Sequence, residues 1–107
     1  MRNVRKGRKV VYPKETVYES GLKGPIGIAL SYLKESEPHY HKKTTEWYLV
    51  MKGTATAYIN KKKIDLKKYD IIMIPPKATH YAKSRGTVEL WVVSYPFWRK
   101  TDHYKID

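Results

Sequence analysis

Hydrophobic and polar residues alternate along most of this chain, and the apolar runs are short. In the stretch "VELWVVS", Val88, Leu90 and Val92 would lie on one face of a strand and the residues between them on the other. Such runs are rich in β-branched and aromatic residues and end at Gly, Pro, Asn or basic clusters, which is typical of strands. We expect strands at residues 9–12, 16–20, 26–33, 46–51, 54–59, 63–66, 70–74, 80–84 and 88–94. The tail that follows is not assigned.

Closely spaced turn signals indicate how these strands connect. The stretch "YINKKKIDL" predicts a hairpin that turns near Asn60 and Lys61, because asparagine tolerates the left-handed conformation that such turns need. Many short strands separated by such turns are typical of a β-sandwich or β-barrel. No linker, low-complexity tract or internal repeat interrupts the pattern. We therefore expect an all-β fold and a single domain over residues 1–107, with a basic N-terminal arm at about residues 1–8.

Composition narrows the possible chemistry. The chain has 107 residues, enough for one hydrophobic core, and no cysteine. The absence of cysteine excludes disulfides and thiolate-bound metals, so any metal must be held by histidine and oxygen ligands. Neither a signal peptide nor a membrane-spanning run is recognisable, which predicts a cytoplasmic protein without membrane contact.

The charge is strongly positive. There are 22 Lys and Arg against 10 Asp and Glu, a formal net charge of +12. This bias can reflect attraction to an anionic partner, or only a well-solvated surface. A basic cluster, Lys61–Lys63 with Lys67 and Lys68, can contact nucleic-acid phosphates. No nucleic-acid-binding motif accompanies it, so this function remains the less favoured alternative.

The stretch "EPHYHKKTTEWYLVMKG", residues 37–53, places His39 and His41 one residue apart. On a strand both side chains leave the same face, with Cα atoms about 6.5 to 7 Å apart. Glu46 follows His41 by an odd number of residues and would point away from it on a straight strand. It can converge with the histidines only if the chain turns within "KKTT" and returns as the next strand. The spacing therefore predicts a strand, a turn and a second strand.

A further histidine lies in the second half of the chain, in "YDIIMIPPKATHYAKS", residues 69–84. The Pro-Pro pair ends one strand and sets up a rigid turn before His80 begins the next. In a small barrel, His39, His41, Glu46 and His80 would converge from different strands. Three imidazoles and one carboxylate form a suitable ligand set for a transition metal, with positions left for water or substrate.

These residues resemble the motifs of the cupins, small β-barrels of the jelly-roll type. The first cupin motif is matched at residues 39–53, as His-x-His, four residues, Glu, six residues and Gly53. The second is matched at residues 69–84 by Pro75 and His80. The departures are Leu33, Tyr69 and Lys77 where glycines are expected, and Ser84 where an asparagine is expected. Lys77 would cost on the order of 1 kcal/mol if its turn needs a positive φ.

The resemblance implies a jelly-roll barrel, metal ligation by the same four residues, and a homodimer. The cofactor would be one divalent transition metal ion per subunit, either Fe, Mn, Ni, Co or Zn, since the ligand types do not choose among them. We expect the protein to bind or act on a small anionic molecule at this ion, with oxygenase- or isomerase-type chemistry if it is an enzyme. Such an enzyme would be a metal-dependent dioxygenase or sugar-phosphate isomerase. The alternative is a binding or sensing module without chemistry.

Several neighbouring residues have expected roles. The candidate catalytic residues are Glu46, as a general base if it leaves the ion, and Tyr48, which shares the strand face of Glu46. Lys77 would favour an anionic substrate. Inward-facing alanines at 55, 57 and 82 would leave room for a ligand. His103 matches no motif, so we expect a surface residue and do not count it as a ligand.

Overall fold

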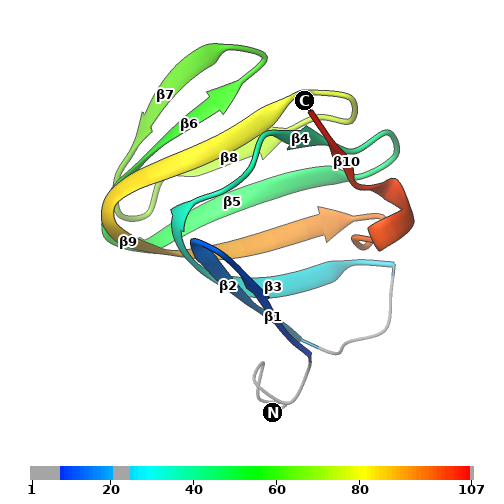
Figure 1. Cartoon of the computed structure of the whole chain (residues 1–107), viewed down its shortest axis with the longest axis horizontal. Helices are drawn as coiled ribbons and strands as arrows, with labels where there is room; N and C mark the ends of the chain where they lie inside the picture. Colours follow the sequence, from blue (N-terminus) through cyan, green and yellow to red (C-terminus); the bar gives the residue numbers. More distant parts are fainter. Residues whose placement is uncertain (1–7, 21–24, 107) are drawn as a thin grey trace.

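The computed structural model describes residues 8–20 and 25–106, and within these residues it contains strands and one 3-10 turn but no α-helix (Figure 1). The elements are β1 (Lys9–Tyr12), β2 (Glu15–Glu19), β3 (Gly27–Glu35), β4 (His39–Tyr40), β5 (Thr45–Lys52), β6 (Ala55–Ile59), β7 (Lys62–Leu66), β8 (Ile71–Ile74), β9 (His80–Tyr95), η2 (Lys100–Asp102) and β10 (Tyr104–Lys105). The all-β prediction is confirmed. Of the basic arm, only Arg8 falls within the described residues. No helix of the described part has the length and apolar character needed to cross a membrane.

Strand β9 organises the sheet. Its first residues pair with β4 and β6, and the residues from Val88 onward pair with β3 and β5, always antiparallel. Figure 1 shows β9 curving between the two halves of a curled sheet. The prediction of separate strands at 80–84 and 88–94 is therefore wrong. The polar stretch "SRGT" between them has the composition of a turn, but here it is the part of one strand that passes from one half of the sheet to the other.

The hydrophobic core follows from the alternation of the strands. In β5 every second residue is buried, namely Glu46, Tyr48 and Val50, and their neighbours face outward. The side chains of Leu33, Val50, Val88 and Leu90 are almost fully buried between the two halves of the sheet. Burial of such side chains is the main stabilising contribution to a fold of this size.

Three turns place non-glycine residues in the left-handed region. The hairpin between β6 and β7 turns at Asn60 and Lys61, with φ angles of 48° and 69°, as the asparagine predicted. Tyr69 and Lys77 have φ angles of 73° and 72°, so both keep the conformation that glycine would favour at these cupin-motif positions. The Lys77 N–H donates a hydrogen bond to the carbonyl of His41. This turn therefore supports the segment that carries the histidines.

Replacing Lys77 with glycine is expected to raise the free energy of unfolding by about 1 kcal/mol. Relief of left-handed strain, roughly 1–2 kcal/mol, exceeds the roughly 0.4–1 kcal/mol lost to the greater freedom of the unfolded chain. Chemical denaturation measures the difference. Lys77→Ala is the matched control, because it removes the same exposed side chain but keeps the strain. Equal stability of the two variants would contradict the assignment of strain.

Candidate metal centre

The four predicted ligands come together where the chain folds back on itself. His39 lies in β4 directly opposite His80, the first residue of β9. The chain then turns through residues 41–44 and enters β5, whose buried face carries Glu46. The predicted strand, turn and second strand are confirmed. The odd spacing between His41 and Glu46 is compatible with convergence only because of this turn.

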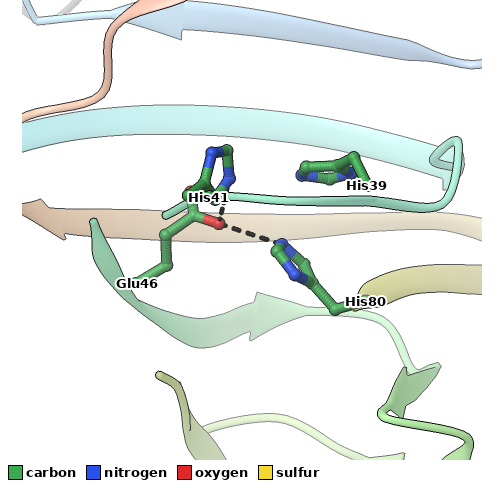
Figure 2. Close-up of side chains that lie close together, drawn as sticks. All are labelled: His39, His41, Glu46 and His80. Atoms are coloured by element: carbon green, nitrogen blue, oxygen red, sulfur yellow. Dashed lines mark hydrogen bonds and ion pairs between the residues drawn. The ribbon is translucent and has the colours of Figure 1, made fainter. Parts of the chain in front are cut away.

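The side chains of these four residues face one another inside the protein (Figure 2). All four are buried, and a ligand atom from each lies within 4.8 Å of the others. Glu46 Oε1 is 3.1 Å from His41 Nε2 and 3.0 Å from His80 Nε2. The ring centroids of His39 and His80 are 4.2 Å apart. This buried group of three histidines and one glutamate can hold a metal ion.

The hydrogen bonds of the outer ring nitrogens orient all three histidines in the same way. Nδ1 of His39 lies 2.8 Å from the carbonyl of Glu37, and Nδ1 of His80 lies 2.9 Å from that of Ala78. Nδ1 of His41 lies 2.7 Å from the carbonyl of Asp102. A carbonyl oxygen only accepts, so each Nδ1 carries the hydrogen and donates it. A neutral ring oriented in this way has its Nε2 lone pair free to bind a cation, as outer partners impose on metal-bound histidines. Here Nε2 of His80 donates a hydrogen bond to Glu46 Oε1 at 3.0 Å.

The electrostatics of the cluster also fit a divalent cation. Burial, aided by His80, lowers the pKa of His39 to about 3, so this ring is neutral at physiological pH. Burial opposes the charged form of Glu46, but His41 and His80 outweigh it and hold the pKa of the carboxyl below its usual range. His41 Nε2 lies 3.1 Å from Glu46 Oε1 without forming a hydrogen bond to it. Burial lowers the pKa of His41, but the Glu46 carboxylate outweighs this effect and raises it. A cation bound between these nitrogens and the carboxylate would take the place of the proton.

Asp102 is a supporting residue that the sequence did not reveal. Its buried carboxylate accepts hydrogen bonds from the N–H groups of Lys42 and Lys43, at 2.9 and 3.1 Å, and from the Thr44 hydroxyl at 3.3 Å. Burial raises the pKa of this carboxyl, but these donors outweigh it, so the pKa lies below its ordinary value. Asp102 therefore holds the turn between the histidines and Glu46. An acid in a tail of unassigned structure gave no signal for this role.

His103 differs from the sequence prediction. It is half-buried and its ring stacks on that of His39, with centroids 4.4 Å apart and an interplanar angle of 9°. The indole N–H of Trp98 donates to His103 Nδ1 at 3.2 Å. Burial, and then the nearby His41, lower the pKa of this ring. The prediction of a surface residue is wrong because the tail packs against the site. His103 does not belong to the group of four converging ligand atoms.

A cavity of about 740 Å³ opens beside the four residues. This volume is in the range of small-molecule sites. His39, His41 and Glu46 lie in its wall, with apolar residues of β1–β3 and residues of the C-terminal segment 97–105. The space does not come from the alanines at 55, 57 and 82, which are packed in the hydrophobic core. Lys77 is exposed and is not part of the wall.

Comparison with known sequences identifies the family. The sequence signature described as "Cupin domain" matches residues 32–94, more than half of the chain, and the chain therefore belongs to the cupins. The uncharacterized protein MJ1618 of Methanocaldococcus jannaschii is 35% identical over 60 residues. That match covers 54% of this chain and 48% of the relative, so it spans about half of the relative's length.

Solved structures share the fold. A variant of Streptomyces Pac13 with uridine has a TM-score of 0.90 and 14% identity, over 99% of this chain and 88% of that chain. Pac13 is described as a nucleoside dehydratase. A variant of oxalate decarboxylase from Bacillus subtilis has a TM-score of 0.82 and 16% identity, over 94% of this chain and 30% of that chain. These similarities confirm a cupin-type jelly-roll β-barrel.

Proposed function

We propose that this cupin binds one divalent transition metal ion, Fe, Mn, Ni, Co or Zn, through His39, His41, Glu46 and His80. We further propose that it takes a small anionic molecule into the adjoining cavity. The observation that carries the proposal is the common orientation of the three histidines, each with Nδ1 bound to a backbone carbonyl and Nε2 directed at Glu46 and one another. When bound, the ion would act as a Lewis acid toward a ligand oxygen.

The cavity wall supports an anionic ligand. Most of its charged residues are paired with one another: Arg8 with Glu19 at 3.0 Å, Lys14 with Glu35 at 3.9 Å and Lys105 with Glu37 at 3.3 Å. Arg99 and Lys100 also line the cavity, and neither makes an ion pair within the described residues. Arg99 and Lys100 would attract an anionic group to their segment of the wall, whereas the carboxylate of Glu15, which accepts a hydrogen bond from Ser31, lines the wall from β2.

Glu46 and Tyr48 remain the candidate catalytic residues. Burial, together with the nearby Glu46 carboxylate, raises the pKa of Tyr48 well above its ordinary value. The Tyr48 hydroxyl would therefore stay protonated and donate a hydrogen bond to a ligand in the cavity. Glu46 would act as a ligand, or as a general base when it is not bound to the ion. Oxygenase- or isomerase-type chemistry is proposed, and a small-molecule binding or sensing module without chemistry is the alternative.

Elemental analysis of the purified protein tests the metal site. We expect about one transition metal ion per chain, either as purified or after titration, and less than a tenth of that in His41→Ala. A direct ligand should matter at least as much as an outer partner, whose loss costs 10- to 100-fold in affinity. Tyr48→Phe is the control and should keep the metal, because it removes no converging ligand atom. A wild-type protein that neither contains nor takes up metal would refute the proposal.

We also propose a homodimer formed through the outer face of the sheet. The outward-facing side chains of β5 lie beside outward-facing residues of its neighbours β8 and β9, and those of β9 lie beside residues of β3. Together they form an apolar face: Leu30, Trp47, Leu49, Ile71, Met73, Trp91 and Val93. Ile71 and Met73 are 63% and 55% exposed. A second copy has the same net charge of +12, so contact through this apolar face, with Lys52 and Glu89 paired in register at its edge, would keep most of the like charges apart.

Replacing Ile71 and Met73 together with lysine is expected to convert the dimer into a monomer. The change introduces like charges across a two-fold interface and leaves the core intact. Sedimentation equilibrium measures the mass, which should fall from twice 12.6 kDa to 12.6 kDa. Ile26→Lys, at another exposed apolar position, should leave the dimer unchanged. A monomeric wild-type protein at concentrations of about 100 μM would rule the interface out, since stable dimers associate far below this.

A further inference from the structure

We infer that His103 positions the ligand at the proposed metal centre by donating a hydrogen bond from Nε2–H to a carboxylate oxygen of that ligand. This inference rests on the proposed function and names the ligand as a small carboxylate. It begins from the place of the ring. His103 stacks on His39 at 4.4 Å, its ring centroid lies 5.3 Å from that of His41, and it lines the cavity. A ligand that reaches the centre through this cavity passes beside this ring.

The protonation of the His103 ring follows from its partner. The indole nitrogen of Trp98 is always a donor, so His103 Nδ1, 3.2 Å away, must accept. In the neutral ring the hydrogen is then on Nε2. This is the reverse of His39, His41 and His80, which carry the hydrogen on Nδ1. The described structure therefore holds three histidines oriented to bind a cation and a fourth, in ring contact with His39 and His41, oriented to donate a hydrogen bond.

The chemical class of the ligand follows from the groups around this donor. Among the described residues, His103 Nε2 has no hydrogen-bond partner, and the unpaired cations Arg99 and Lys100 lie in the same short segment of the cavity wall. A neutral N–H donor beside positive charge suits an anionic acceptor that can use more than one oxygen. A carboxylate has this property and can also contact a metal ion with its remaining oxygen.

The tautomer can be tested without metal or activity. Long-range ¹H–¹⁵N spectra of the metal-free protein should show a single His103 tautomer with the hydrogen on Nε2. Trp98→Phe removes the indole N–H but keeps an aromatic ring, and it should yield a mixture of tautomers. A wild-type ring with the hydrogen on Nδ1 would overturn the inference. This result does not depend on whether the protein binds metal, so it separates failure of the inference from failure of the proposed function.

Calorimetric titration of the zinc-loaded protein with oxalate tests the ligand contact. His103→Phe preserves a ring against His39 but removes the donor, and it should weaken oxalate binding about tenfold or more at unchanged zinc content. Tyr104→Phe, next in the chain, keeps its stacking on Tyr40 and should bind oxalate like the wild type. If His103→Phe fails to fold, Trp98→Phe should still show weaker binding. Equal affinity of the folded variant, or no oxalate binding by the zinc-loaded wild type, would overturn the inference.

Discussion

Replacing Asp102 with alanine is expected to weaken transition-metal binding 10- to 100-fold, the usual effect of losing an outer partner of a ligand. The Asp102 carboxylate accepts hydrogen bonds from the N–H groups of Lys42 and Lys43. The backbone carbonyl of Asp102 accepts the hydrogen bond from His41 Nδ1. The variant keeps this carbonyl but loses the anchor that places it. Calorimetric titration of the metal-free protein with zinc measures the affinity.

The same variant should also lower the free energy of unfolding, by about 2–3 kcal/mol, because buried donors lose their acceptor. The pKa of Asp102 is depressed in the folded state, so its contribution is fully present above the unfolded value of about 3.9 and is lost as the pH falls through the lower, folded value. The stability difference from wild type should accordingly shrink only below about pH 4. Thr101→Ala, at an exposed neighbouring position, is the control for the segment. Unchanged zinc affinity in a destabilised Asp102→Ala protein would show that the residue supports the fold but not the site.

The part of the site that the sequence predicted is the part built by neighbouring residues. Motif spacing and the alternation of strand faces were sufficient to predict that His39, His41 and Glu46 converge, and that a turn brings the carboxylate back to the histidines. They also correctly placed Tyr48 on the buried face of its strand. Lys77 and Tyr69 keep the left-handed turns of the motif without glycine. Local backbone requirements of this kind can be read from short stretches.

The part of the site that the sequence did not predict depends on contacts between segments far apart in the chain. The carboxylate of Asp102 bonds residues about 60 positions away, and the ring of His103 stacks on His39 from the same tail. No periodicity in residues 95–107 indicates where that tail will pack, so the acid gave no signal and the histidine was predicted to lie on the surface. The break predicted within β9 failed for a related reason. Strand pairing on both sides of Arg85–Thr87 comes from β3, β5 and β6, which composition alone does not show.

Replacing Glu46 with glutamine is expected to lower stability much more with metal than without it. The exchange keeps size and shape but removes the negative charge. With zinc at 100 times the wild-type dissociation constant, wild type should gain about 2.7 kcal/mol, or roughly 10 to 20 °C in Tm. If the variant binds zinc about 100-fold more weakly, it gains only about 0.4 kcal/mol at the same zinc concentration.

Without metal, the glutamine variant should lose only the stability that His41 and His80 give to the carboxylate, whose pKa they hold below its usual range. The buried Glu46 carboxylate lies 3.1 and 3.0 Å from His41 and His80, and the desolvation penalty of such a buried cluster offsets much of this gain. Thermal unfolding with EDTA and with zinc, for both proteins, gives the four values needed. A cluster that served only to stabilise the fold would behave differently: Glu46→Gln would lower the Tm by the same amount in EDTA and in zinc, because zinc would raise the Tm of neither protein. A difference between the two proteins that grows with zinc is therefore the signature of a site whose charges are arranged for a cation.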